Sequence, residues 1–298
     1  MKVFRKVLFT LALAGNITIL SSQNVAVFDE FLYKSESQMK ASENQYLNPI
    51  LPGCYPDPSI CRVGKDYYLV NSSFSYYPGV PIWHSTDLIH WTQLGHVLNR
   101  SSQLLTKNSK MSWGVYAPDI KYNPHNKTFY MITTGTGYGN TTYVKTDDPK
   151  KCNWSDPIAL PSVKGIDPSF FFDEDGKAYI LNNEPPAYEP LYDGHRAIWI
   201  REFDWKNDRV VGEPKVVIDG GLDITKKPSW IEGPHLYKIK GKYYLMAAEG
   251  GTGPNHREVI LTSDSPMGPF IPCAINPILT QMGLPSDRKE PITCAGHA

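Results

Sequence analysis

The sequence predicts an all-β fold, a β-propeller in which four-stranded sheets surround one axis. Composition is the first observation behind this prediction: the 298 residues include 18 Tyr, 11 Phe and 7 Trp, together with 23 Gly and 25 Pro. Many aromatic and many turn-forming residues are typical of short strands joined by tight loops. The other two observations are a repeated hairpin pattern and an acidic residue at the start of every repeat.

The repeat consists of an acidic residue beside a proline, an apolar strand, a turn and a second strand that is rich in tyrosine. Four segments follow this layout, at positions 55–70, 117–132, 166–181 and 230–246. The prolines that mark them are Pro58, Pro118, Pro168 and Pro234. Successive hairpins at intervals of roughly 50–66 residues predict four-stranded propeller blades. A β-sandwich is the structural alternative, but it does not explain the acidic residue that opens each unit.

The first strand of each unit is expected to be the innermost strand of a blade. The unit starts would therefore bring Asp57, Asp119, Asp167 and Glu232 to one central cavity. Carboxyl groups that repel each other in one cavity can include both a proton donor and an ionised base. A single acidic residue beside a proline can instead cap a turn. The shared position in four units favours the catalytic interpretation.

The charge balance excludes one class of partner. The chain has 30 Lys and Arg against 30 Asp and Glu, so its formal net charge is zero. Nucleic-acid binding needs a surplus of basic side chains, and we expect no such partner. The apolar fraction of 41% is sufficient for a buried core.

The N-terminal residues have the features of a targeting signal. Lys2, Arg5 and Lys6 precede an apolar run at positions 7–20. A helix of that length extends about 21 Å, which is shorter than the roughly 30 Å hydrocarbon core of a membrane. We therefore expect a signal peptide at residues 1–22 rather than an uncleaved anchor, and a linker or N-terminal arm at residues 23–46. The mature protein is expected to be secreted or periplasmic and not bound to a membrane.

The five cysteines do not form a recognisable framework. They show neither the C-x-x-C spacing of metal or redox sites nor the density of a disulfide scaffold. An exported chain can pair some of them, and the sequence does not indicate which. We expect them to be small buried residues. They are Cys54, Cys61, Cys152, Cys273 and Cys294.

Five motifs point to a known family. They are NPILPGCYPDPS at 48–59, PGVPIWHSTDL at 78–88, WGVYAPD at 113–119, IDPS at 166–169 and IEGPH at 231–235. In combination they closely resemble glycoside hydrolase family 43, and the likeness extends over roughly residues 48–298. The resemblance implies a five-bladed propeller, with about four blades present in a catalytic domain at residues 47–298.

The resemblance also implies an activity and roles for the acidic residues. Members of the family are inverting β-xylosidases, α-L-arabinofuranosidases and arabinanases. Asp57 would be the general base that activates water, and Glu232 the general acid that protonates the leaving oxygen. Asp167 would orient that acid and modulate its pKa. Asp119 would be a substrate-binding residue of the same pocket.

Further residues are expected to contact substrate. Phe74, Tyr76 and Trp83 lie in the stretch that resembles xylosidase-like members, and core packing is the alternative for each of them. His297 resembles the family's axial histidine, which contacts the substrate or, through water, a central calcium ion. Calcium would be structural, and the reaction requires no cofactor.

We expect an exo-acting enzyme that releases xylose or arabinose from xylan or arabinoxylan glycosides. Endo-arabinanase on the same fold and a non-catalytic carbohydrate-binding propeller are the alternatives. Positions 296–297 stand where a fifth innermost strand should begin, and a further blade needs about 50 residues at this period. The sequence therefore predicts a propeller whose fifth blade is incomplete.

Overall fold

A computed structural model describes residues 42, 44–103, 110, 112–135, 140–285 and 287 of the chain. The described residues from Tyr46 onward belong to one compact unit. The predicted signal peptide, nearly all of the predicted linker, Cys294 and His297 lie outside the described residues. In the described part of the chain, no helix has the length and apolar character needed to cross a membrane.

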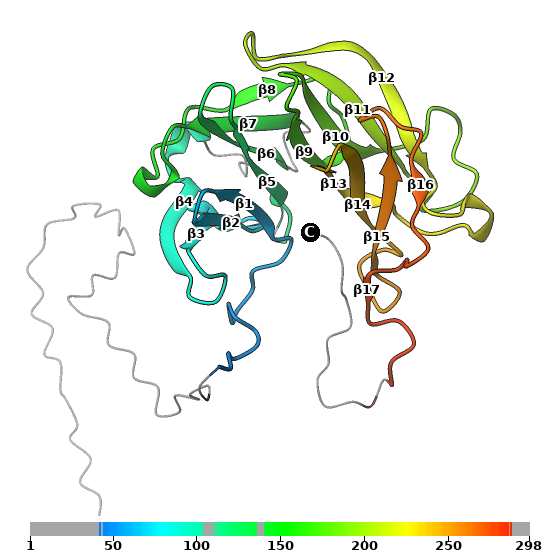
Figure 1. The fold of residues 1–298 in the computed structure, drawn as a ribbon, viewed down its shortest axis with the longest axis horizontal. Coiled ribbons are helices and arrows are strands. Elements are labelled where there is room, and N and C mark those ends of the chain that lie inside the picture. Colours follow the sequence, from blue (N-terminus) through cyan, green and yellow to red (C-terminus); the bar gives the residue numbers. More distant parts are fainter. Residues whose placement is uncertain are drawn as a thin grey trace, which may run out of the picture. The chain divides into compact units, whose positions relative to one another are not determined.

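The compact unit contains four antiparallel sheets that follow one another along the chain as blades 1 to 4 (Figure 1). Blade 1 consists of β1 (Ser59–Val63), β2 (Asp66–Val70), β3 (Gly79–Ser85) and β4 (Thr92–Leu98). Blade 2 consists of β5 (Val115–Asn123), β6 (Thr128–Gly135), β7 (Asn140–Thr146) and β8 (Ile158–Leu160). Short 3₁₀ helices follow β4 and β7, namely η1 (Ser101–Gln103) and η2 (Pro149–Lys151).

Blades 3 and 4 repeat the same order. Blade 3 consists of β9 (Ile166–Phe172), β10 (Ala178–Glu184), β11 (Ala197–Asp204) and β12 (Arg209–Asp219), and η3 (Ile224–Lys226) follows it. Blade 4 consists of β13 (Glu232–Ile239), β14 (Lys242–Glu249), β15 (Arg257–Ser263) and β16 (Ile271–Pro272), with β17 (Leu279–Thr280) also paired to β15. The predicted all-β propeller with about four blades is confirmed.

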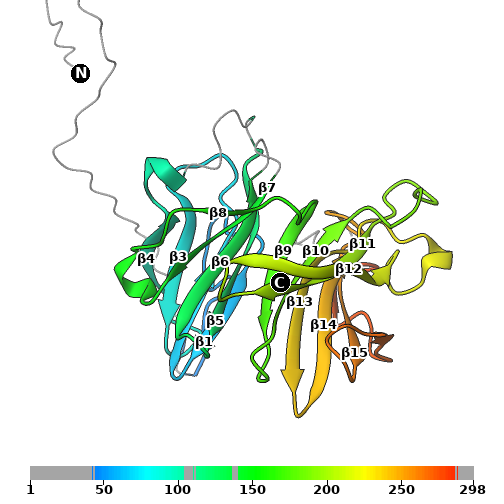
Figure 2. The same ribbon diagram turned by 90° about the horizontal axis from the view of Figure 1, so that it is seen from above.

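The first strand of each blade lies innermost, as the repeat predicts. β5 packs between β1 and β9, and β9 packs between β5 and β13. Figure 2 shows β5, β9 and β13 side by side in the order of the sequence. The starts of these strands therefore come together, although more than half of the chain separates Ser59 at the start of β1 from Glu232 at the start of β13.

The cores of the molecule lie between the blades. Val70 and Ile82 of blade 1 pack with Ile120 and Met131 of blade 2 in one buried cluster. Aromatic rings dominate the next interface, where Tyr130 of blade 2 meets Phe170 of blade 3 edge to face at 5.6 Å between ring centroids. Each fully buried side chain of this size contributes about 1.5–3 kcal/mol, so these interfaces fix the angle between neighbouring blades.

A similar cluster joins blades 3 and 4. Leu181 and Ile198 of blade 3 pack with Leu236 and Leu245 of blade 4, and all four are 1% exposed or less. This packing sets the position of β13 against β9, and with it the position of the residues at their starts.

Hairpin turns follow from local sequence. Lys240 and Gly241 connect β13 to β14 with φ values of 51° and 80°. Two successive residues with positive φ form the type I′ turn, whose twist matches that of the two strands. Glycine adopts this conformation without strain, which explains the Gly at the second position.

The prediction for the cysteines is only partly correct. Cys61 is buried in the core between blades 1 and 2, whereas Cys152 and Cys273 are half-buried and Cys54 is exposed. These four described cysteines are all free thiols. Cys54 precedes β1 and is exposed, so its burial was wrongly predicted.

Candidate active site

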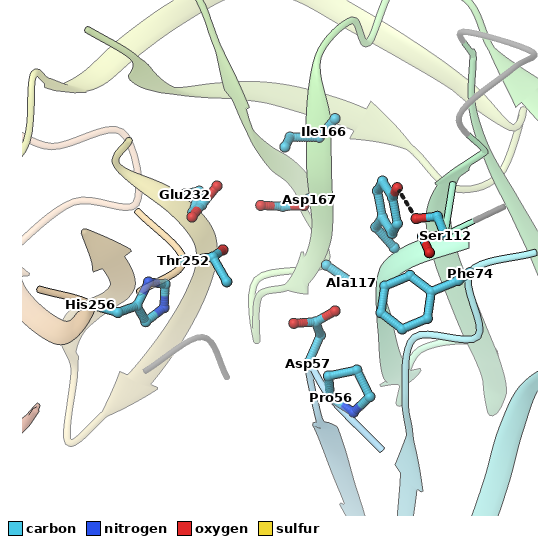
Figure 3. Close-up of a pocket in the computed structure, with 11 residues that line it drawn as sticks. Pro56, Asp57, Phe74, Ser112, Ala117, Ile166, Asp167, Glu232, Thr252 and His256 are labelled. Atoms are coloured by element: carbon cyan, nitrogen blue, oxygen red, sulfur yellow. Dashed lines mark hydrogen bonds between the residues drawn. The ribbon is translucent and has the colours of Figure 1, made fainter. Parts of the chain in front are cut away.

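A cavity of about 550 Å³ opens at the starts of the innermost strands. All three predicted catalytic residues, Asp57, Asp167 and Glu232, line it from blades 1, 3 and 4. Figure 3 shows their carboxyl groups pointing toward the same space. The other lining residues are Pro56, Phe74, Ser112, Tyr116, Ala117, Ile166, Thr252 and His256.

The residue before the marker proline has the same unusual backbone conformation in every blade. We call these four residues the mouth ring: Asp57 (φ 52°), Ala117 (36°), Asp167 (54°) and Gly233 (54°). The left-handed region is unfavourable for residues other than glycine, and such strain concentrates at functional sites. The mouth ring therefore marks the point at which each blade turns its chain toward the axis.

Ser72 holds the side chain of Asp57. The Ser72 hydroxyl accepts a hydrogen bond from the Ala117 N–H at 2.7 Å and donates its own proton to Asp57 Oδ2. Because the backbone N–H can only donate, the Ser72 proton is directed to the carboxylate. Ser72 is 3% exposed, so this bond is shielded from water and fixes the rotation of the carboxyl group.

Asp167 and Glu232 are linked through the backbone of blade 4. The N–H of Gly233, next to Glu232, donates to Asp167 Oδ2 at 3.1 Å. Both carboxyl-bearing residues are largely buried, with 5% and 8% exposure. Asp167 therefore contacts the strand that carries Glu232 and can set its position.

Arg196 adds a positive charge near this pair. Burial lowers the pKa of Arg196, and the charges of Glu184, Glu232 and Asp167 oppose that shift. Its Nε donates to Asn183 Oδ1 at 2.8 Å, and Asn183 Nδ2 donates to the carbonyl of Ile231. This chain of bonds leads directly to the residue before Glu232.

Two aromatic rings form one wall of the cavity. Phe74 lies edge to face on Tyr116, with 5.5 Å between the ring centroids. The Tyr116 hydroxyl donates to the carbonyl of Ser112 at 2.7 Å, which holds the ring in place. A Cβ atom at Gly114 would lie 2.0 Å from the Phe74 carbonyl oxygen, so only glycine allows the backbones to approach this closely. Rings of this kind are suited to stacking on sugars.

The loop between β14 and β15 closes another side. It supplies Thr252, which is exposed, and His256, which is 1% exposed. The Nδ1 atom of His256 donates to the carbonyl of Gly251 at 2.8 Å. That bond fixes both the ring and the loop around it.

Asp119 does not line the cavity and lies deeper along the axis. Its position belongs to a second set of residues, each following the marker proline, which we call the axial ring: Ser59, Asp119, Ser169 and His235. Ser59 Oγ donates to Asp119 Oδ1 at 2.8 Å, and the Phe170 N–H donates to Oδ2 at 2.8 Å. Asp119 thus ties blades 1, 2 and 3 together.

Lys121 balances the charge of the axial ring. Its Nζ lies 3.2 Å from Asp119 Oδ1, and His235 Nδ1 lies 3.5 Å from the same oxygen. Burial opposes the charged form of Lys121, but the interactions with Asp119, Tyr237 and Cys61 together outweigh it and hold the pKa of Lys121 above its usual value. With Asp119 only 1% exposed, this ion pair is a buried structural element.

The remaining predicted residues lie elsewhere. Trp83 is 8% exposed and packs edge to face on Tyr55, with 5.0 Å between the ring centroids. It does not line the cavity. Tyr76 is 73% exposed and also does not line it. Among the described residues, no group of three or more His, Cys, Asp or Glu side chains is arranged to hold a metal ion. Calcium was predicted to contact His297 through water, and it stays a prediction because His297 lies outside the described residues.

Sequence reasoning missed Ser72, Tyr116, Thr252 and His256. Tyr116 directly precedes Ala117 in the WGVYAPD motif, so the position of the blade start could have identified it. Ser72 follows β2, and Thr252 and His256 lie in a loop, where no repeat or periodicity marks them.

The model of the glycosyl hydrolases family 43 matches residues 46–298. The chain belongs to this family. The resemblance seen in the sequence motifs is therefore confirmed over nearly the whole of the described region.

Two relatives support the assignment. The chain is 45% identical over 253 residues to a xylosidase/arabinosidase of Butyrivibrio fibrisolvens, covering 84% of this chain and 47% of the relative. It is 40% identical over 267 residues to a non-reducing end alpha-L-arabinofuranosidase of Bacteroides ovatus, covering 88% and 46%. The chain thus spans about half the length of these relatives.

Solved family 43 structures share the fold. A protein described as a GH43_12 from the capybara gut metagenome superposes with a TM-score of 0.77 at 55% identity, covering 82% of this chain and 46% of that one. A xylan beta-1,4-xylosidase from Bacillus halodurans C-125 superposes with a TM-score of 0.73 at 38% identity, covering 85% and 47%.

Proposed function

We propose that the protein is an inverting exo-glycosidase that removes xylose or arabinose from xylan- or arabinoxylan-derived glycosides. The observation that carries the proposal is the convergence of Asp57, Asp167 and Glu232, from three blades, on one cavity of about 550 Å³. A cavity of this size is typical of small-molecule sites. The names of the Butyrivibrio and Bacteroides relatives support the choice of sugars.

In the proposed reaction, Asp57 takes a proton from water and Glu232 gives one to the glycosidic oxygen. Water attacks the anomeric carbon from the side opposite the leaving group, the glycosidic bond breaks, and the configuration inverts. Ser72 orients the base, and Asp167 orients the strand of the acid through the Gly233 N–H. Phe74 and Tyr116 hold the sugar ring against the cavity wall. We propose no cofactor for these steps.

The cellular context is part of the same proposal. A carbohydrate polymer is an extracellular substrate for most cells, which agrees with the signal peptide predicted at residues 1–22. We propose that the mature protein is secreted or periplasmic and acts on oligosaccharides there.

A leaving-group series tests the proposal. Aryl β-xylosides and aryl α-arabinofuranosides of differing leaving-group acidity, with xylobiose, are assayed on the full chain and on Glu232→Gln. The wild type should cleave at least one aryl series and release single sugars. Glu232→Gln should lose far more activity on xylobiose than on the most activated aryl glycoside, which needs little protonation.

Three results would contradict the proposal. Cleavage of linear arabinan into oligosaccharides without single sugars would indicate an endo-arabinanase. Binding of xylobiose without any hydrolysis would indicate a carbohydrate-binding propeller. Equal losses on all leaving groups in Glu232→Gln would remove Glu232 from the role of acid.

A further inference from the structure

A second hollow adjoins the candidate active site on the side of Glu232. It has a volume of about 260 Å³ and is lined by Trp230, Glu232, Gly251 and Thr252. Glu232 and Thr252 also line the main cavity, whereas Asp57 and Asp167 line only the main cavity. Glu232 therefore stands at the boundary between the two spaces.

The position of a general acid indicates where the leaving group of the substrate lies. The acid must reach the glycosidic oxygen, which joins the sugar that is attacked to the group that leaves. Water activated by Asp57 attacks from the face opposite the leaving group. If the attacked sugar lies in the main cavity beside Asp57, the leaving group extends past Glu232 toward the second hollow.

Trp230 is the large side chain of that hollow, and its surroundings hold it in place. It is 37% exposed, and the guanidinium carbon of Arg196 lies 4.8 Å from the centre of its ring. The backbone N–H of Trp230 donates to the carbonyl of Gly194 at 2.9 Å, which fixes the main chain that carries the ring. Arg196 is itself fixed by its bond to Asn183. A partly exposed indole held by a cation is suited to stacking against a sugar.

The backbone of Trp230 is also unfavourable for so large a residue. Its φ is 49°, in the left-handed region. For residues other than glycine such a conformation costs about 1–3 kcal/mol, and it persists at binding sites where the surroundings enforce it. Trp230 lies two residues before Glu232 in the sequence, and its side chain lines the second hollow.

We propose that Trp230 is the stacking platform for the leaving-group sugar and thereby determines how well the enzyme accepts a second sugar. This inference rests on the proposed function, since it takes Glu232 as the acid. The ligand class is a pentose of a xylo- or arabino-oligosaccharide, attached through the bond to be cleaved. At this subsite, Trp230 contacts the leaving-group sugar of a disaccharide, but it does not contact a leaving group as small as fluoride.

The kinetic test compares two substrates with the same attacked sugar. Xylobiose has a sugar as leaving group, and β-xylosyl fluoride has only fluoride. Trp230→Ala should lower kcat/KM for xylobiose about tenfold, as expected for the loss of an aromatic contact, and change that for the fluoride less than twofold. Trp230→Phe should retain most of the xylobiose activity. Trp91→Ala, which alters a tryptophan of blade 1 that lines neither hollow, is the matched control.

A binding test separates this inference from the proposed function. In the Asp57→Asn background, calorimetry with xylobiose and with xylose measures affinity without turnover. Adding Trp230→Ala should weaken xylobiose about tenfold and xylose less than twofold. Absence of hydrolysis by the wild type would overturn the proposed function, while the binding comparison would still decide the role of Trp230. Equal effects on both sugars, no effect on xylobiose, or no binding of either sugar would overturn the inference.

Discussion

The mouth ring and the axial ring lie two residues apart at the starts of the same four innermost strands, on either side of the marker proline. In the mouth ring, Asp57 and Asp167 line an open cavity. In the axial ring, Asp119 is 1% exposed and accepts hydrogen bonds on both carboxyl oxygens. A two-residue displacement thus separates a carboxylate that faces substrate space from one that joins blades.

The two rings show how a repeated scaffold can separate chemistry from stability. Blade 2 has Ala117 in the mouth ring, where blades 1 and 3 have aspartates, and carries its acidic residue in the axial ring instead. A charge in the axial ring needs partners because it is buried, and Lys121 and His235 supply them. The two rings should therefore respond differently to mutation.

The largest effect is expected in the mouth ring. Asp57→Asn keeps a group that accepts the Ser72 hydrogen bond but cannot take a proton from water. Activity should fall about 10³-fold on every substrate, because a general base contributes roughly 10²–10⁴-fold. The melting temperature should remain that of the wild type. Steady-state kinetics and calorimetry on the same preparation measure both, and retention of a tenth of the activity would place the base elsewhere.

The axial ring should show the opposite pattern. Asp119→Asn leaves Lys121 buried without its negative partner, which typically costs about 3–5 kcal/mol. For a chain of this size that corresponds to a fall in melting temperature of roughly 10 °C. Activity per folded molecule should stay within about threefold of the wild type, since Asp119 does not line the cavity. A large loss of kcat with unchanged melting would show that the two rings are not separate in function.

A smaller effect is expected at Ser72, whose hydroxyl bonds Asp57 of the mouth ring in blade 1 and the N–H of Ala117 in blade 2. Ser72→Ala removes the O–H that holds the Asp57 carboxyl group in position, and kcat should fall about tenfold. Ser72→Thr retains the hydroxyl and should restore kcat. Steady-state kinetics on the two variants measure both, and an unchanged kcat in Ser72→Ala would show that this bond does not orient the base.

The smallest effect concerns the pH dependence of the axial ring. Burial lowers the pKa of Lys121, but Asp119, with Tyr237 and Cys61, raises it above the usual value of 10.5. A raised pKa means that the ion pair stabilises the fold below pH 10.5 and that this stability is lost as the pH rises through the pKa of the folded state. The melting temperature of the wild type should therefore fall more steeply than that of Lys121→Met at alkaline pH. Parallel curves for the two proteins would contradict the assignment.

The sequence predicted the blades and the acidic residues at the mouth ring, because both depend on local patterns. Hairpin turns and the proline markers predict the strands, and Asp57, Asp167 and Glu232 all lie within one residue of the mouth ring. Asp119 was predicted as a pocket residue because the repeat pattern does not distinguish acidic residues on the two sides of a proline. An acidic residue before the marker proline faces the cavity, whereas a residue after it, such as Asp119, is buried between the blades. Only the register of the strands in the structure shows this difference.

Other parts of the site depend on long-range packing. Every residue of β3 but one is buried, so alternation along the strand could not show that Trp83 faces Tyr55 rather than the cavity. Thr252 and His256 reach the cavity through the conformation of the β14–β15 loop. Trp230 meets Arg196 from a different blade, and no sequence pattern relates the two.

The anomeric configuration of the first product tests the proposed roles of Asp57 and Glu232. Proton NMR follows the hydrolysis of an aryl β-xyloside by the full chain before mutarotation mixes the anomers. A water molecule activated by Asp57 and a leaving group protonated by Glu232 lie on opposite faces of the sugar, so α-xylose should form first. Initial formation of β-xylose would mean retention through a covalent intermediate, and it would contradict the assignment of Asp57 as the base.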